Sequence, residues 1–201
     1  MQVASRIAAW KSGKKLPYKR RIAYLESTGT QWIDTGLMSS PYRYPFEIAC
    51  FSLDAKYICG GGTSSKEGFG VRCLSVPKNG VVSIGFAWTR ELNYWDRAFS
   101  GEYYTVGASD GKYVFNGTGG NTITCPPSDS NFILFGRKVG DTVESSKVRI
   151  FYSIKEQQSL IPVMDFNDVP CMYDEVSGEF FYNQGTGDFL YGELDLGGWG
   201  L

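Results

Sequence analysis

The chain has 201 residues, a formal net charge of −1 and no histidine. The missing histidine excludes Ser-His-Asp and Cys-His nucleophile systems and histidine-ligated zinc. Aromatic residues make up 15% of the chain and glycine occurs 25 times, whereas charged residues reach only 20%. This composition favours short strands joined by turns over helices or disorder, and the length favours one domain with a short extension.

Basic residues are concentrated at the N-terminus. Seven of the 20 Lys and Arg residues, and none of the 21 acidic ones, lie within residues 1–21. Val3, Ile7 and Trp10 recur at helical spacing, so residues 2–11 favour a short amphipathic helix, with a frayed terminus as the alternative. The Gly- and Pro-containing segment that follows favours an extended linker.

We therefore predict that residues 1–21 form a basic arm that docks on a partner. The residues expected to make this contact are Arg6, Trp10, Lys14, Lys15, Lys19, Arg20 and Arg21. Binding of nucleic acid is disfavoured, because Trp10 and Tyr18 alone make no stacking platform and the rest of the chain is net acidic. An acidic surface on another protein is the better match.

Strand and turn signals begin at Ile22. The segment "YLESTGTQWIDTG", residues 24–36, places Glu26, Trp32 and Asp34 close together, but its alternating runs and central turn favour the first hairpin of a β domain over a catalytic site. Further strands are expected within residues 44–62, 68–88, 102–118, 131–138, 147–166 and 169–196, with no internal helix. Asp110-Gly111, Asn116-Gly117 and Ser177-Gly178 favour hairpin turns. The pattern predicts an antiparallel sandwich or barrel.

Two stretches carry a family resemblance. "IAYLESTGTQWIDTG" (22–36) and "LIPVMDFNDVPCMYDEVSGEFFYNQGTGDFLYG" (160–192) resemble the opening and closing strands of concanavalin A-like, laminin G-like jelly rolls from small gut-bacterial and phage structural proteins. "GEYYTVGASDGKYVFNGTG" (101–119) is similar to a central strand pair of such domains. The resemblance implies an all-β, two-sheet antiparallel jelly-roll sandwich over residues 22–192, with adjacent first and last strands and a C-terminal tail at 193–201.

The cysteines favour a reducing compartment. Cys50, Cys59, Cys73, Cys125 and Cys171 are odd in number and show no metal-ligand spacing, and their apolar surroundings predict buried thiols. We expect folding in a cytoplasm, because no export signal is visible. We also expect no membrane insertion, because no run approaches the roughly 20 apolar residues that span a bilayer.

The acidic residues give little indication of a catalytic site or a metal site. Glycosidases of this fold carry an E-x-D-x-x-E strand, which is absent here, and the acids of "YDEVSGE" (173–179) lie at a hairpin where they solvate a turn. Calcium could use Asp110, Asn116, Asp129 or Asp141, but turn formation explains these residues better. We expect no catalytic residues, no metal and no cofactor.

Glycan binding is the favoured chemistry. The segment 85–101 gathers aromatic and charged residues that could stack on a pyranose and bind its hydroxyls, namely Trp88, Arg90, Tyr94, Trp95, Asp96 and Arg97. The alternative is that its aromatic residues point into the core while the charged residues face solvent.

These observations lead to an expected function. We expect a non-enzymatic virion protein of a gut-bacterial phage, a fibre, tail or head appendage. It would attach to other virion proteins through the arm, form a homo-oligomer on the particle and adhere to host or mucosal glycans. The alternative is a carbohydrate-binding or adhesin module on a bacterial cell surface, and the third candidate is a glycosidase-like enzyme.

Overall fold

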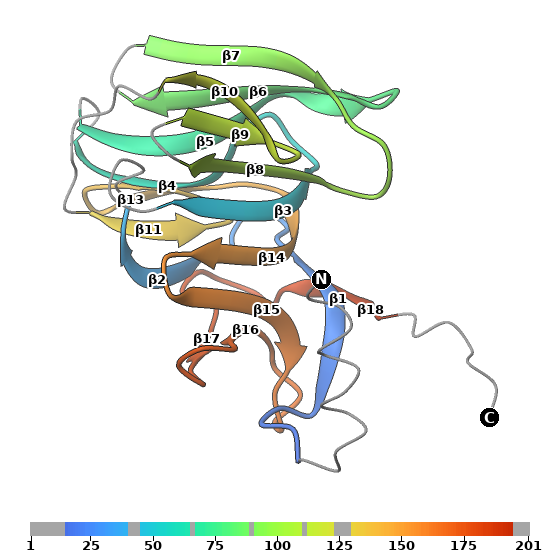
Figure 1. The fold of residues 1–201 in the computed structure, drawn as a ribbon. Coiled ribbons are helices and arrows are strands. Elements are labelled where there is room, and N and C mark those ends of the chain that lie inside the picture. Colours follow the sequence, from blue (N-terminus) through green and yellow to red (C-terminus); the bar gives the residue numbers. More distant parts are fainter. Residues whose placement is uncertain are drawn as a thin grey trace.

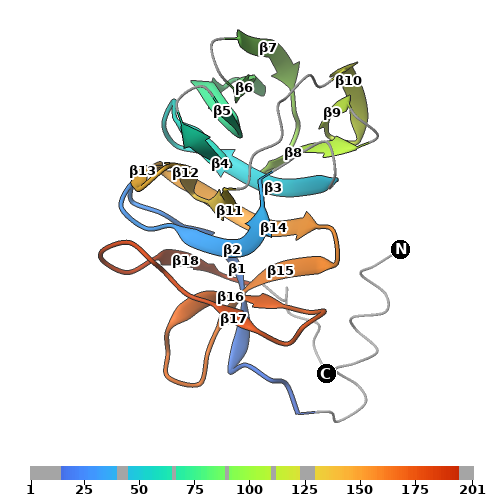
Figure 2. The same ribbon diagram turned by 90° about the vertical axis from the view of Figure 1, so that its left-hand side faces the viewer.

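Two β-sheets face each other in the computed structural model (Figure 1 and Figure 2). The structure describes residues 15–39, 45–64, 67–88, 91–109, 112–122 and 130–194, with only the backbone described at 64, 67, 87–88, 91–95 and 121. Strands and turns account for the secondary structure of these ranges, and no helix occurs in them, so none could cross a membrane.

Each sheet draws strands from distant parts of the chain. The 10-stranded sheet A contains β1 (Arg20–Glu26), β3 (Phe46–Ser52), β8 (Tyr104–Ser109), β9 (Lys112–Phe115), β10 (Thr118–Thr122), β14 (Val148–Lys155), β15 (Gln158–Met164), β16 (Pro170–Asp174), β17 (Phe180–Phe181) and β18 (Leu190–Glu193). The 8-stranded sheet B contains β2 (Ile33–Met38), β4 (Tyr57–Ser64), β5 (Glu67–Lys78), β6 (Val81–Trp88), β7 (Glu91–Ala98), β11 (Asn131–Leu134), β12 (Gly136–Val139) and β13 (Thr142–Ser145).

The strand order confirms the predicted jelly-roll sandwich. The chain passes repeatedly between the two sheets, and the strand pairings of the described residues are antiparallel except that of β12 with β4. The first and last strands are adjacent, because β1 pairs with β18 from Ile22 opposite Glu193 to Glu26 opposite Leu190. Leu25 and Ile150 of sheet A and Ile33 and Phe86 of sheet B belong to one buried cluster between the layers.

The predicted hairpin at residues 24–36 is wrong. β1 lies in sheet A and β2 in sheet B, so the intervening residues cross from one layer to the other. The buried Gln31 holds this crossing: its Oε1 accepts a hydrogen bond from the Thr28 backbone N–H at 2.8 Å, and its Nε2 donates to the Thr186 carbonyl at 3.0 Å. Pairing with a distant segment therefore overrides the local turn signal.

The structure confirms two other predicted hairpin turns and the predicted burial of four cysteines. Asn116 and Gly117, with φ of 47° and 74°, connect β9 to β10 in the predicted hairpin, and residues 175–179 connect β16 to β17 in another. Cys50, Cys59, Cys73 and Cys171 are buried free thiols, as expected, while Cys125 and the Asp110-Gly111 turn lie outside the described residues.

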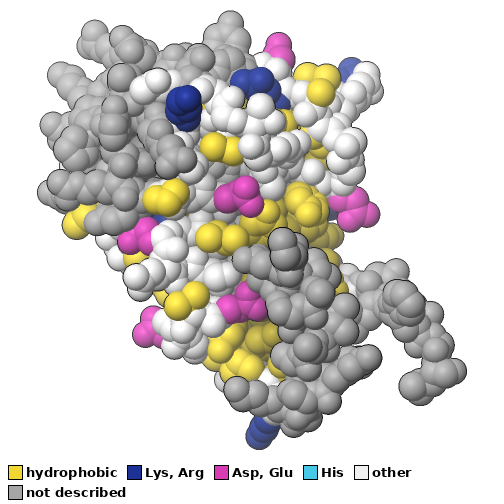
Figure 3. All heavy atoms as spheres, in the orientation of Figure 1, with side chains coloured by type: hydrophobic (Ala, Val, Ile, Leu, Met, Phe, Trp, Pro, Cys, Tyr) yellow, Lys and Arg dark blue, Asp and Glu magenta, His cyan; other side chains and the backbone are white. Residues whose placement is uncertain are grey.

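Hydrophobic side chains also remain on the surface. On the face drawn in Figure 3 they gather where β3, β14 and β1 come together in Figure 1. Tyr103 and Leu190 are among the exposed large hydrophobic residues of the protein. This face of sheet A is therefore less polar than a fully solvated sheet surface would be.

A lysine side chain is buried in the core. Lys155, at the end of β14, is only 2% exposed, and its Nζ lies 5.3 Å from the centre of the Phe132 ring and 3.9 Å from Glu156 Oε1. Burial lowers the pKa of this amine to about 8, while the nearby Glu156 carboxylate acts in the opposite direction. Near neutral pH the fold therefore holds a charged amine in an apolar setting.

Replacing Lys155 with Met should raise the free energy of unfolding at pH 7 by about 1–3 kcal/mol, because folding no longer desolvates an ammonium group. Between the lowered pKa of the folded state and the unfolded value of about 10.4, the unfolded chain binds more protons, so stability of the natural chain rises with pH. The difference in the free energy of unfolding between Lys155→Met and the natural chain, measured by urea unfolding, should decrease from pH 7 to pH 10. An equal advantage at both pH values would contradict this, and the exposed control Lys112→Met should change stability little at either.

Candidate functional site

An open groove of about 480 Å³ lies at the rim of the sandwich. Three segments from both sheets form it: the middle of β2, the turn between β14 and β15, and the hairpin of β16 and β17. Its lining residues are Thr35, Gly36, Leu37, Glu156, Gln157, Gln158, Asp174, Val176, Ser177, Glu179 and Phe181. We call this the rim groove.

The floor of the rim groove is fixed by a contact between the sheets. Glu156, at φ 56°, turns the chain tightly so that Lys155 pairs with Gln158 across the β14–β15 hairpin. The buried Gln158 then donates a hydrogen bond from Nε2 to the Thr35 carbonyl of β2 at 3.1 Å. This bond ties sheet A to sheet B and sets where the groove opens.

One wall depends on a buried carboxylate. Asp174 Oδ1 accepts hydrogen bonds from the backbone N–H groups of Ser159 at 2.8 Å and Val176 at 3.1 Å, and Oδ2 accepts one from Ser177 at 3.2 Å. Burial alone would raise the pKa of Asp174, but these hydrogen bonds outweigh it and hold the pKa below its ordinary value. Asp174 is therefore an ionised structural group: the motif does form the predicted turn, but Asp174 caps it from a buried position, whereas Glu175 and Glu179 are exposed as expected.

The remaining lining residues offer contacts to a ligand. Val176 and Glu179 are exposed and Leu37 and Phe181 half-buried, so apolar surface lies beside a carboxylate. No Lys or Arg is among the described residues that line the groove. Apolar surface with a few hydrogen-bonding groups suits a ligand that has a C–H face and hydroxyl donors. An anionic ligand would meet carboxylates without a compensating base.

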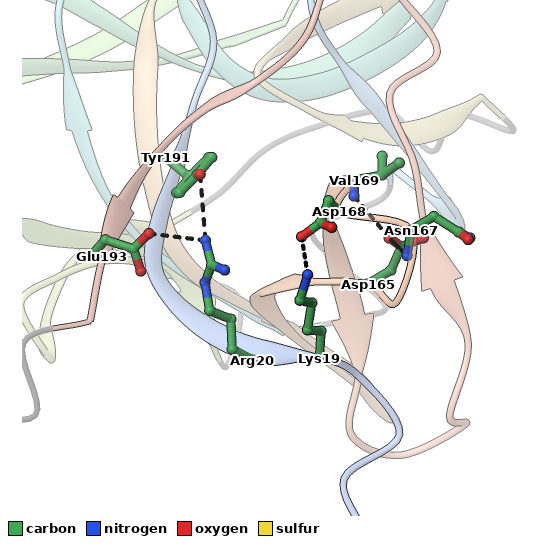
Figure 4. Close-up of polar contacts among 8 residues, drawn as sticks. All are labelled: Lys19, Arg20, Asp165, Asn167, Asp168, Val169, Tyr191 and Glu193. Atoms are coloured by element: carbon green, nitrogen blue, oxygen red, sulfur yellow. Dashed lines mark hydrogen bonds and ion pairs between the residues drawn. The ribbon is translucent and has the colours of Figure 1, made fainter.

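The acidic motif at residues 165–169 forms a second capped turn (Figure 4). Asp165 Oδ1 accepts hydrogen bonds from the backbone N–H groups of Asn167 and Val169, both at 2.8 Å, and Oδ2 accepts one from the Tyr182 hydroxyl at 3.1 Å. These bonds outweigh burial and lower the pKa of Asp165. Within the described ranges, no group of three or more Cys, Asp or Glu residues could hold a metal ion.

The end of the predicted arm is built into the body of the protein. Lys19 Nζ lies 2.5 Å from Asp168 Oδ1, and Arg20 donates to Glu193 at 3.0 Å and to the Tyr191 hydroxyl at 3.4 Å (Figure 4). Arg20 and Arg21 open β1 and pair with Met164 and Val163 of β15. The body thus begins two residues before the predicted boundary at Ile22.

The other arm residues divide between two groups. Lys15 is exposed. Arg6, Trp10 and Lys14 lie outside the described residues, as do positions 195–201 of the predicted tail. Docking by these residues stays a prediction.

The glycan site predicted from the sequence lies elsewhere, on β6 and β7. Asp96 is exposed and accepts a hydrogen bond from Ser83, whereas Arg97 is half-buried and pairs with the buried Val82. Asp96 and Arg97 are consecutive in a strand and therefore lie on opposite faces of the sheet. The side chains of Trp88, Tyr94 and Trp95 and the whole of Arg90 lie outside the described residues, so this site stays a prediction.

Sequence reasoning missed the rim groove as a binding site. The hairpin turn at Ser177-Gly178 was predicted, but the polar run at residues 156–158 was not singled out. What brings them together is the bond between Gln158 and Thr35, whose positions lie 123 residues apart.

Comparisons with known proteins add one structural likeness. No protein-family model matches the chain, and no curated protein matches it. Among solved structures, the chain is similar to a native heptameric SAP-like pentraxin from Limulus polyphemus, at 13% identity over 71% of this chain and 77% of the pentraxin chain, with a TM-score of 0.49. The fold assignment above rests on the sheets and their strand order.

Replacing Asp174 with Asn should lower the free energy of unfolding at pH 7 by about 1–3 kcal/mol, because an amide nitrogen would face backbone N–H donors. The stabilisation from a carboxylate with a lowered pKa is present above the unfolded value of about 3.9 and is lost as the pH falls through the folded value. The difference between the two proteins in urea unfolding should therefore narrow from pH 7 to pH 3. A constant difference would argue against the ionised cap, and exposed Asp188→Asn serves as the matched control.

Proposed function

We propose that this protein is a non-enzymatic glycan-binding jelly-roll module, displayed on a phage particle as a fibre, tail or head accessory protein. The observation that carries the binding part is the rim groove, where Leu37, Val176 and Phe181 lie beside Gln157 and Glu179. The non-enzymatic part is supported by the missing histidine and by the structural use of Asp174.

The lining chemistry favours neutral sugars. A pyranose presents a C–H face that packs on apolar side chains, and its hydroxyls donate well to a carboxylate such as Glu179. Uronic or sialic acids would place a negative charge beside Glu156 and Glu179 with no base on the lining. The groove is open and shallow, so single contacts should be weak, and repeated display on one particle would raise the avidity.

Display on a virion is supported by the sequence. The stretches 22–36 and 160–192 resemble domains of phage and prophage structural proteins, and a basic segment precedes the first strand. In this proposal residues 1–14 attach the module to other virion proteins, and copies assemble as a homo-oligomer. The rim groove would equally serve an adhesin on a bacterial surface. Neighbouring genes for capsid or tail proteins would favour the virion, and genes for polysaccharide use would favour the adhesin.

A multimerised chain on a glycan array should bind neutral oligosaccharides in preference to uronic or sialylated ones. Phe181→Ala combined with Glu179→Gln should weaken this binding at least tenfold, because it removes apolar surface and replaces a carboxylate with a neutral amide, a weaker acceptor, while leaving the Asp174 cap in place. Phe166→Ala, at a side chain 59% exposed in the turn before β16, should bind as the natural chain does.

Two results would overturn the proposal. Absence of binding to every glycan by the multimer would remove the adhesive role. Unchanged binding by the groove variant, with loss in Trp95→Ala, would move the site to β6 and β7.

A further inference from the structure

Three aromatic rings form a row across sheet A. The Tyr103 ring centre lies 4.9 Å from that of Phe151, which lies 5.4 Å from that of Tyr24. Tyr24 belongs to β1 and Phe151 to β14, and Tyr103 directly precedes β8, so the row crosses several strands. We call these three residues the outer aromatic row.

Alternation along the strands places this row on the outer face of the sandwich. Each ring is next in sequence to a residue buried in the core: Leu25 follows Tyr24, Ile150 precedes Phe151, and Tyr104 follows Tyr103. Neighbouring residues of a strand lie on opposite faces, so the three rings face away from the core. Phe151 also lies at the irregularity between Ile150 and Tyr152 in the pairing with β3, which adds a residue to this face.

The row is extended and partly open. Tyr103 is 44% exposed, and Leu190 of β18, which pairs with Glu26 beside Tyr24, is 53% exposed. A side chain at Gly192 would lie 2.4 Å from Tyr24 Cε1, so Tyr24 leans over β18 and closes the space between the two strands. Hydrophobic side chains are visible in this region of Figure 3.

Three carboxylates and one guanidinium border the row, which leaves this surface with an excess of negative charge. Glu102 is exposed next to Tyr103, and Glu47 accepts a hydrogen bond from the Tyr152 hydroxyl at 2.7 Å. Glu26 is paired with Arg149 at 2.5 Å, and the Arg149 guanidinium lies 4.9 Å from the centre of the Tyr24 ring. An apolar segment that carries positive charges fits such a surface better than an apolar segment alone.

We propose that residues 2–11 of the same chain bind the outer aromatic row as an amphipathic helix. The spacing of Val3, Ile7 and Trp10 gives this segment one apolar stripe, and Arg6 and Lys11 flank it with positive charge. The segment contains no acid that would repel the carboxylates around the row.

Chain length and the point of entry favour this occupant. A helix over residues 2–11 is about 15 Å long, and the following residues 12–15 span up to about 13 Å when extended. The chain then enters the body through Lys19 and Arg20, which their ion pairs hold at the start of β1, the strand that carries Tyr24 (Figure 4). The inference goes beyond the proposed function, because it concerns the unattached chain: attachment to other virion proteins would release residues 2–11 from the outer aromatic row.

Limited trypsin digestion of the full chain, followed by mass spectrometry, tests the contact. Cleavage after Arg6 and Lys11 should be at least tenfold slower than in the variant Tyr103→Ser/Phe151→Ser, since an isolated helix of this length is too unstable to protect itself. The arm variant Ile7→Ser should accelerate cleavage after Arg6 in the same way without altering the body. The control Phe166→Ser, on an exposed side chain in the turn between β15 and β16, should leave the rate unchanged.

Repeating the digestion at several protein concentrations distinguishes a contact within one chain from a contact between two copies. Protection within one chain is independent of concentration, whereas protection that grows with concentration, together with dimers in light scattering, would assign the row to a second copy and overturn the proposal. Equal and rapid cleavage in the natural chain and both variants would overturn it as well. Glycan binding that survives in all these variants would leave the proposed function intact in either case.

Discussion

The arrangement of this protein depends on β1, because three other strands pair with it. Leu25 and Glu26 face β14 on one side and β18 on the other, while Arg20 and Arg21 pair with β15. Ile22 and Leu25 are also buried in the core between the sheets. One strand near the N-terminus therefore holds the last strand of the chain in place and sets the course of β15.

β15 runs from the rim groove to the point where the N-terminal arm enters the body of the protein. β15 and β16 are paired from Leu160 opposite Asp174 to Met164 opposite Pro170. The rim groove lies at the Gln158 end of this ladder, and the entry of the N-terminal arm, fixed by Lys19 and Asp168, lies at the other end. At about 3.3 Å per residue the two ends are about 20 Å apart. A module attached through its arm would thus present the groove away from the attachment.

Local sequence signals were sufficient to predict the β-sandwich. They did not predict the features that depend on contacts between residues far apart in the sequence. Alternation and turn dipeptides such as Asn116-Gly117 are short-range, so the strands and the sandwich followed from them. The supposed hairpin at residues 24–36 failed because β1 pairs with β14, β15 and β18 in one sheet and β2 with β11 in the other, all of them distant in sequence. The rim groove was not foreseen for the same reason, since Gln158 and Thr35 meet only in the folded chain. The basic run was assigned wholly to an arm because charge alone does not reveal that Lys19 and Arg20 have acidic partners at Asp168 and Glu193.

If the rim groove is the binding surface, a bound sugar must perturb the residues that form it. An NMR titration of the ¹⁵N-labelled chain with the neutral oligosaccharide that binds best on an array measures this directly. We expect amide shifts that are confined to residues 35–37, 156–158 and 174–181, which form the groove. Shifts confined to residues 81–98 of β6 and β7, with the groove amides unmoved, would contradict it.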